Sequence, residues 1–484
     1  MRLVFIVVFV SATLLLSACS DGTSLSSGPF APQADTSEGL TNVSSDLMAV
    51  LEGGTLAGAC DAYWADVSEG DATRRQRLLC GKEMFFYEGF DTIGVPTVLL
   101  TTMLELFPNQ IGPGASGVGM IPDPTSEAGL PLGFGPGQDA AEGVAALAFT
   151  CASCHFGQLP DGRYAMGAPN HDYAYGEMNL ASAVLPLSAL LGTEPEPSAA
   201  AVLAPYLAEM EADPTIETRM LSALAPLAGS GVSLPDFTPE LQAQYAAWKP
   251  GTMDFVIVPL PLDDEVHTVS KIMSLWGIAS DDEVDAFEMD GALLGHTGVS
   301  TSVLNFLQGF VVLGGGDTEA WTDERLGPLE DFILSLRAPD NPNPPPSDLA
   351  DRGAELFVSA GCANCHDGAR GSSRVVYAFD EIGSDTAMQR WLDPDLDGQP
   401  CCDVDLTGRD SLTGGIRAQR LVGVWSAKRL LHNGSIDTLE ALFCLGTNRP
   451  TITASPFSDQ GHRYTCDNLT EEEKQALIAH LRTL

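Results

Sequence analysis

The sequence predicts a mainly α-helical protein in which two similar domains are joined by a proline-rich linker and preceded by an N-terminal extension. Three observations support this fold class. The pattern C-x-x-C-H occurs twice, at 151–155 and at 362–366. Apolar residues with helical spacing lie before and after each copy. Residues 341–346 hold four prolines, which cannot continue a helix and form a stiff spacer between the copies.

Length and charge limit what the chain can be. Its 484 residues suit two or three domains, and 44% of them are apolar, which is enough for real cores. Asp and Glu number 65 against 24 Lys and Arg, so the formal net charge is −41. Phosphate groups would be repelled, which excludes nucleic acid as a partner and disfavours adsorption on anionic lipid.

The N-terminus has the layout of an export signal. Arg2 precedes an apolar run at 3–16 that is too short to span a bilayer, and Leu-Ser-Ala-Cys follows at 16–19. This ending resembles the lipobox of bacterial lipoproteins, in which the cysteine is lipidated and becomes the mature N-terminus. The resemblance implies a signal peptide at 1–18 and an exported protein that meets a bacterial membrane only through a lipid on Cys19. Such a protein faces the periplasm or the cell surface; an ordinary signal peptide is the alternative.

The next two segments differ in composition. Residues 19–45 are rich in Ser, Gly, Thr and Asp, and we expect them to form a flexible tether. Residues 46–134 form an N-terminal extension whose role the sequence does not indicate.

The C-x-x-C-H pattern has a physical reason. On one turn of helix, residues i and i+3 share a face, so both sulfurs reach the two vinyl groups of one haem. The histidine that follows projects toward the iron as its proximal ligand. We therefore expect two covalently attached haem c groups, held by Cys151, Cys154, His155, Cys362, Cys365 and His366.

Two other kinds of site use paired cysteines. A zinc knuckle would need a second ligand pair at finger-like spacing, whereas the two patterns lie about 210 residues apart. A thioredoxin-like redox pair has no use for a trailing histidine, which is present both times. Both alternatives fit the sequence less well than haem.

The chain repeats itself around the two patterns. A helical run predicted at 139–149, before the first pattern, is matched by one at 349–359, before the second. Further on, segment 271–278 is matched in character by segment 417–424. The repeat therefore predicts two domains of the same kind.

Each repeat closes with an amphipathic helix, and these helices set the domain boundaries. The first closing helix is predicted within 326–336 and the second within 469–484, where Thr470 is a suitable N-cap. We place the first haem domain at 135–340 and the second at 346–484.

This order of elements resembles the di-haem cytochrome c peroxidase superfamily, in which two cytochrome c-like domains share an interface. The resemblance covers 135–484 and is strongest at 423–435, Gly-Val-Trp-Ser-Ala-Lys-Arg-Leu-Leu-His-Asn-Gly-Ser. Gly-His-Arg-Tyr at 461–464 is most similar to the branch that includes bacterial rubber oxygenases.

The resemblance implies a di-haem oxidoreductase. The first haem would reduce peroxide or another small oxidant with electrons relayed through the second. The alternatives are a non-catalytic electron carrier with both irons saturated and, with less support, an oxygenase of a hydrophobic substrate. For a redox protein this acidic, we expect a basic partner such as a small cytochrome c.

For the second haem, the resemblance implies His462 as the distal iron ligand, because that branch places a histidine just before the closing helix. Met388 is the runner-up, and a surface histidine without a role is the other reading. His432 more often supports structure at the haem edge in this family. We expect His480, on the closing helix, to be solvated.

For the first haem, the resemblance implies His171, because the peroxidases carry a displaceable histidine a short way after the first pattern. A histidine without a role and no protein ligand at all are alternatives, and the other candidates are Met289, His296 and His267. Glu177 and Glu288 are candidate acid–base groups. Trp276, in the repeated segment, is a candidate for electron transfer between the haems or a core residue.

Six further cysteines remain, an even number that favours disulfides in an oxidising compartment. Cys60 and Cys80 could join within the extension. Cys444 and Cys466 could pair, but Cys401 and Cys402 could each compete.

Three aspartates at alternate positions in 393–397, followed by glycine, begin like a calcium loop, although the twelfth position is Val404 instead of Glu. A solvated acidic turn is the other reading.

Overall fold

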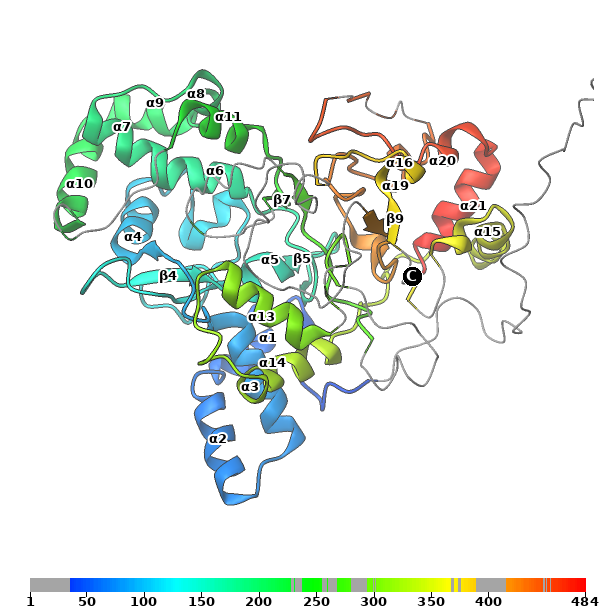
Figure 1. Cartoon of the computed structure of the whole chain (residues 1–484), viewed down its shortest axis with the longest axis horizontal. Helices are drawn as coiled ribbons and strands as arrows, with labels where there is room; N and C mark the ends of the chain where they lie inside the picture. The colour runs from blue at the N-terminus through cyan, green and yellow to red at the C-terminus, as the bar shows by residue number, and fades with distance from the viewer. Residues whose placement is uncertain are drawn as a thin grey trace, which may run out of the picture.

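The computed structural model describes residues 35–227, 230, 237–254, 259, 268–279, 294–298, 300, 302–366, 370–372, 376–388, 415–446, 449, 451–452 and 454–484. In these residues helices predominate and strands are short, which confirms a mainly α fold. Figure 1 shows the elements from α15 onward on one side of the molecule and the earlier elements on the other. The predicted signal peptide, Cys19 and most of the predicted tether lie outside the described residues.

The N-terminal extension is built from helices that pack on the first of the two predicted domains. The helices are α1 (Leu47–Val50), α2 (Ala59–Glu69), α3 (Arg74–Tyr87) and α4 (Thr97–Leu106), with short 3-10 turns at Glu52–Gly54 and Pro113–Val118. Helix α3 begins at a capping box between Thr73 and Gln76. It packs against α14 (Asp323–Ser335), and Arg77 forms an ion pair of 2.6 Å with Asp331. The extension and the first domain therefore share one hydrophobic core.

Two small sheets tie these parts together. One has the order β1-β6-β5 and the other β2-β4-β3, all antiparallel. Their strands are β1 (Val43–Ser44), β2 (Val95–Pro96), β3 (Phe134–Pro136), β4 (Ala146–Phe149), β5 (Phe156–Gln158) and β6 (Tyr164–Met166). Strand β1 lies in the segment expected to be tether, so the ordered fold begins before residue 46.

The helix predicted at 139–149 is absent, and this prediction was wrong. Residues 146–149 form strand β4, in which burial alternates along the chain. This strand is the central one of its sheet and pairs on both sides. Pairing on both sides supplies the backbone hydrogen bonds that a helix would otherwise provide. The neighbouring strands therefore stabilise a strand here over the helix that the local sequence favours.

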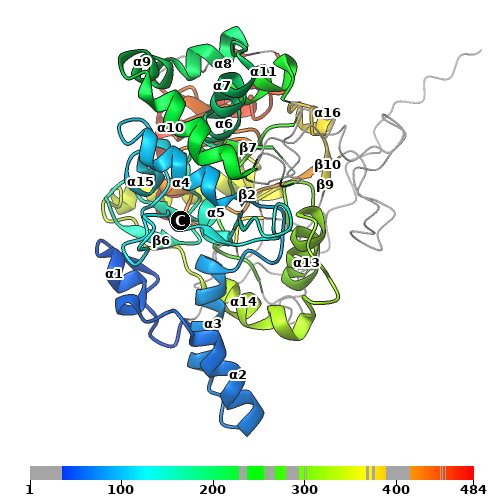
Figure 2. The ribbon, with the colours of Figure 1, turned by 90° about the vertical axis from the view of Figure 1, so that its left-hand side faces the viewer.

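The rest of the first domain is a helical cap followed by two packed helices. The cap consists of α6 (Tyr175–Asn179), a π-helical turn (Leu180–Val184), α7 (Leu185–Leu191), α8 (Pro197–Val202), α9 (Ala204–Ala212), α10 (Thr215–Leu224), a 3-10 turn (Ala225–Leu227) and α11 (Pro239–Ala247). Strands β7 (Thr252–Met253) and β8 (Ser270–Lys271) pair, and α13 (Val303–Leu313) leads to α14. Figures 1 and 2 both place this cap at the end of the molecule opposite α2.

The C-terminal unit is smaller and is organised by two long helices. Its elements are α15 (Ser347–Ser359), 3-10 turns at Cys362–Asn364 and Val424–Ser426, β9 (Val376–Ala378), α16 (Phe379–Ile382), β10 (Gly415–Arg417), α19 (Leu439–Leu442), α20 (Tyr464–Asp467) and α21 (Glu471–Leu481). Thr470 is the N-cap of helix α21, as predicted, and it also forms a capping box with Glu473. Helices α15 and α21 touch so closely that a Cβ on Gly353 would lie 1.9 Å from the Ala476 carbonyl oxygen.

The packing of α15 on α21 corrects the expectation for His480. This side chain is buried, and its ring lies against that of Phe357 with centroids 5.4 Å apart. It belongs to the helix interface and is not solvated.

Candidate functional site

The first C-x-x-C-H pattern forms the short helix α5 (Cys151–His155). Thr150, just before it, donates its hydroxyl to the Phe86 carbonyl of α3, which holds the helix start in place. Cys151 and Cys154 are free thiols, and burial raises their pKa values to about 12 and about 11. A redox-active cysteine pair needs a lowered thiol pKa, so this environment argues against the thioredoxin-like alternative.

His155 has the arrangement of a metal-binding imidazole. Its Nδ1–H donates to the Met273 carbonyl oxygen at 2.9 Å, which leaves the Nε2 lone pair free. Burial lowers the pKa of His155 to about 4, so the ring stays neutral at physiological pH. The two thiols and the free nitrogen are therefore the donor set that a covalently attached haem requires.

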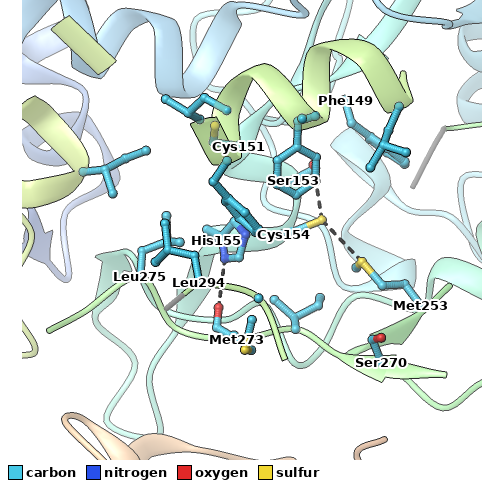
Figure 3. A pocket seen from close by; sticks show the side chains of 18 of the residues that line it. Phe149, Cys151, Ser153, Cys154, His155, Met253, Ser270, Met273, Leu275 and Leu294 are labelled. Carbon is cyan, nitrogen blue, oxygen red and sulfur yellow. Dashed lines mark hydrogen bonds between the residues drawn. The ribbon is translucent and has the colours of Figure 1, made fainter. Parts of the chain in front are cut away.

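A mainly apolar cavity of about 230 Å³ lies beside α5. Helix α13 supplies much of its wall through Phe306, Leu307 and Phe310. Figure 3 shows Cys154 beside Met253, whose sulfur lies 4.0 Å from the cysteine sulfur. The cavity offers an apolar surface to a flat ring system next to the attachment cysteines.

The second pattern has the same arrangement in the C-terminal unit. Cys362 and Cys365 are free thiols. The Nδ1–H of His366 lies 3.0 Å from the Gly371 carbonyl oxygen and 3.1 Å from that of Gln419. Burial lowers the pKa of His366. Its Nε2 is therefore also left free to bind a metal.

The two histidines are held by equivalent residues of the repeat. In the match of 271–278 with 417–424, Met273 corresponds to Gln419, and these two residues supply the carbonyl groups that accept from His155 and His366. Each follows a short strand, β8 or β10. These equivalent hydrogen bonds are further support for the repeat, and the sequence alone does not show them.

His462 lies opposite His366. The two ring centroids are 6.1 Å apart and the rings are inclined at 44°. A metal–imidazole bond is about 2.0 Å long, and the centroid of the ring lies about 1.1 Å beyond the bound nitrogen. When two imidazoles bind one metal from opposite sides, their centroids are therefore about 6 Å apart. The distance between the two rings is compatible with one iron between them.

The surroundings of His462 suit a neutral ligand. Its backbone φ is 55°, in the left-handed region, which few residues adopt without a reason. The side chain is exposed, yet the protein around it desolvates the ring, and this effect and the neighbouring His366 lower its pKa to about 4. Met388, the runner-up, packs instead with Phe379 and Ile416.

The structure does not support His171 as an iron ligand. Its Nε2–H donates to the Ile272 carbonyl at 2.9 Å, and its Nδ1 accepts from the backbone N–H of Lys428 at 3.0 Å. Both ring nitrogens are thus used by backbone groups, one from each unit. His171 is also absent from the wall of the cavity at His155. In this arrangement His171 ties the two units together, and its predicted role as an iron ligand stays a prediction.

Other residues line the first site. His296 is buried in the cavity wall, where its Nε2 lies 3.1 Å from the Lys271 carbonyl oxygen. Met253 was missed, because no sequence signal links it to a motif 99 positions away. Glu177 accepts a hydrogen bond from Tyr206 and is not part of this wall. His267, Glu288 and Met289 lie outside the described residues.

Trp276 and His432 lie in the contact between the units. Trp276 is fully buried and donates its ring N–H to the Met166 carbonyl at 2.8 Å. A Cβ on Gly423 would lie 2.3 Å from the indole, so the second unit packs directly on this ring. The carbonyl oxygen of His432 accepts from the Lys271 N–H at 2.7 Å, which is a structural role.

Two disulfides are present, Cys60–Cys80 and Cys444–Cys466. They settle the pairing that the sequence left open for these four residues. Cys401, Cys402 and the candidate calcium loop at 393–397 lie outside the described residues. Within the described ranges, no three His, Cys, Asp or Glu side chains gather as a metal cluster, and no helix could cross a membrane.

No family model and no curated protein matches the chain. A search of solved structures finds a MauG-like protein associated with microbial copper homeostasis, at a TM-score of 0.23 and 20% sequence identity. The match covers 43% of this chain and 63%, less than two thirds, of that protein. Similarity at this level does not establish a shared fold, so the family stays a prediction from the sequence.

Proposed function

We propose that this protein is a di-haem c-type cytochrome that acts as an oxidoreductase, with a closed relay site in the C-terminal unit and a reactive site beside α5. The proposal rests above all on the equivalent hydrogen bonding of the two motif histidines. His155 and His366 each donate Nδ1–H to a backbone carbonyl and keep Nε2 free, next to two free thiols. Haem bound at both sites would supply one-electron chemistry.

The second site is proposed to relay electrons. His366 and His462 are the residues that would hold the iron here, since their rings lie 6.1 Å apart. A haem held by both histidines would have no site left for an oxidant and would supply electron transfer only. The second site therefore fits a relay better than a catalyst.

The first site is proposed to bind the oxidant. In the described part of the chain, no ring faces His155 as His462 faces His366. Instead, His155 lies beside the apolar cavity, whose wall includes Phe306 and Phe310. Phe310 is also 39% exposed, so the cavity wall reaches the protein surface. The proposed reactant at a haem bound in this cavity is peroxide or another small oxidant.

Electron transfer between the two sites is proposed to pass through the contact around Trp276. The indole lies between Gly167 of the first unit and Gly423 of the second, in direct contact with both. A buried aromatic ring at this point shortens the path through covalent and packed atoms. The hydrogen bond from the indole N–H to the Met166 carbonyl oxygen keeps the ring in place.

The setting of the protein is part of the proposal. The signal and Cys19 favour an exported protein with a lipid anchor on a bacterial membrane. The net charge of −41 favours a basic electron donor such as a small cytochrome c. Labelling with a radioactive fatty acid tests the anchor: Cys19→Ser should lose the label.

Purified, reduced protein tests the proposed reaction. A denaturing gel stained for covalent haem should first show haem on the polypeptide. Carbon monoxide should then bind to one haem. In a separate reduced sample, peroxide should oxidise both haems, because its reduction to water takes two electrons and the closed haem supplies one of them. If neither reagent changes the spectrum, the protein is an electron carrier with both irons saturated.

Paired variants assign the two sites. Replacing Cys151 and Cys154 by Ala should remove the haem that reacts, and replacing Cys362 and Cys365 by Ala should remove the one that does not. Reaction with carbon monoxide that survives the first pair and is lost with the second would contradict the assignment.

A further inference from the structure

Three cations lie between the two units without a described carboxylate partner; Arg417 is buried, and Lys271 and Arg420 are half-buried. They are Lys271 at the end of β8, Arg417 at the end of β10, and Arg420. Burial lowers the pKa of each one: that of Lys271 falls to about 8, with Arg417 as the second cause. No carboxylate contributes to any of these shifts. This is unexpected in a chain where acids outnumber bases by 65 to 24.

The contacts of the two arginines are all with neutral oxygens. Arg417 donates to the Gly295 carbonyl at 2.7 Å and to the Ser372 hydroxyl at 3.0 Å. Arg420 donates to the carbonyl groups of Trp276, at 3.0 Å, and Ser274, at 2.9 Å. These bonds position the guanidinium groups but leave their charge uncompensated.

Arg417 also keeps a free donor. The residue is 3% exposed, and its Nη2 atom is buried with no hydrogen-bond partner. An unpaired buried charge is strongly destabilising, whereas an arginine that meets a carboxylate gains two parallel charge-assisted bonds. An anion bound here would compensate the charge of Arg417 and accept a hydrogen bond from its free Nη2. A carboxylate fits the guanidinium geometry best.

The three cations lie between the two proposed haem sites. Lys271 and Arg420 line the cavity beside His155, and both also line a smaller cavity of about 50 Å³ between the units. The charge of Lys271 acts on His366 and His462 as well. Lys271 and Arg417 moreover hold equivalent positions, each two residues before the carbonyl group that fixes a motif histidine.

We propose that Lys271, Arg417 and Arg420 form a shared site for the propionate carboxylates of the two haems, an inference that rests on the proposed function. Each unit contributes cations to the same place, so the site would neutralise the haem carboxylates and hold the units against each other. The positive charge would also make each iron easier to reduce.

Redox titration of the full holoprotein tests this proposal. Lys271→Met and Arg420→Met should each lower the midpoint potential of at least one haem. At a fixed potential, the ratio of oxidised to reduced haem should change about tenfold, which corresponds to a shift of about 59 mV for one electron. The charge-preserving variants Lys271→Arg and Arg420→Lys should stay close to the wild type. Lys428→Met is a matched control, because Lys428 lies at the same contact but already pairs with Asp172 at 2.5 Å.

The outcomes separate this proposal from the proposed function. Two bound haems with unchanged potentials in both Met variants would overturn the propionate site and leave the proposed function standing. Absence of haem in the wild type would overturn both. A second measurement needs no variant: wild-type potentials should not move when acetate replaces chloride at constant ionic strength. A shift with acetate would mean that the cations bind a free anion, and the proposal would fail.

Discussion

At the scale of single residues, one hydrogen bond decides what each motif histidine can do. A neutral imidazole has one N–H and one lone pair, so fixing the N–H on a backbone carbonyl leaves the lone pair of the other nitrogen available to a metal. His155 and His366 follow this rule, and His171 does not, because both its nitrogens face backbone groups. The C-x-x-C-H residues were predictable because their chemistry is local in sequence.

The distal residues were harder to predict, because their role depends on where distant segments meet. His171 has the expected spacing after the first motif, but Ile272 and Lys428, 101 and 257 positions away, determine its partners. His462 was suggested by resemblance, and its position opposite His366 supports that choice. The cavity residue Met253 had no sequence signal at all.

His462→Ala should open the second haem. Loss of one imidazole would convert that iron from low spin to high spin, which electron paramagnetic resonance detects. The matched control is His171→Ala, which should leave both iron spectra unchanged and destabilise the protein by about 1–3 kcal/mol through the unpaired Lys428 N–H and Ile272 carbonyl. If the iron spectrum changes in His171→Ala and stays unchanged in His462→Ala, then His171 and not His462 binds iron.

Lys82 makes a separate, pH-dependent contribution to stability. It is fully buried, its ammonium donates to Glu52 and to the Thr41 carbonyl, each at 2.8 Å, and burial lowers its pKa to about 8 from 10.5. Between these two values the unfolded chain binds the proton more tightly, so the stability contributed at this position rises with pH.

Denaturant unfolding of wild type and Lys82→Met between pH 7 and pH 10 measures this effect. The wild type should gain stability relative to the variant as pH rises through 8. The exposed Lys249, replaced by Met, is the control and should follow the wild type. Parallel curves for wild type and Lys82→Met would show that burial does not perturb Lys82.

At the scale of elements, the sequence predicted helices better than strands. The helices before and after the second motif were found because apolar spacing and a capping box are local features. The helix expected at 139–149 is a strand because its partners, β2 and β3, lie elsewhere in the chain. Short strands in the middle of a sheet depend on such partners more than on their own sequence.

The packing of α3 on α14 gives a prediction at this scale. A Cβ on Gly81 would lie 2.0 Å from the Pro328 carbonyl oxygen, which is backbone and cannot rotate away. Gly81→Ala should therefore destabilise the first unit by about 1–3 kcal/mol or more, despite the higher helix propensity of Ala. Thermal unfolding measures this. A stabilised Gly81→Ala variant would contradict the close contact between the extension and the closing helix.

At the scale of the whole molecule, the extension of unknown role is part of the first unit. Arg77 and Asp331 pair across 254 positions, and residues from both segments share one core. Sequence patterns carry little information on contacts at such separation. The repeat itself could be recognised, because the C-x-x-C-H pattern and the matched segments around it are local sequence features.

The acidic charge predicts how a redox partner docks. Electron transfer from a basic cytochrome c should slow on the order of tenfold as ionic strength rises from low to physiological values, because salt screens the attraction. Stopped-flow kinetics measures the rate. A small acidic donor is the control, since its rate should stay constant or rise. A basic donor whose rate does not fall with salt would count against the proposed partner.

The central claim is that one haem is closed and the other open to an oxidant. Near-infrared charge-transfer bands of the oxidised protein test it directly, because they report both axial ligand sets at once. We predict one band of a low-spin iron with two histidine ligands, lost in His462→Ala, and one band of a high-spin iron. Two low-spin bands and no high-spin band would contradict the account.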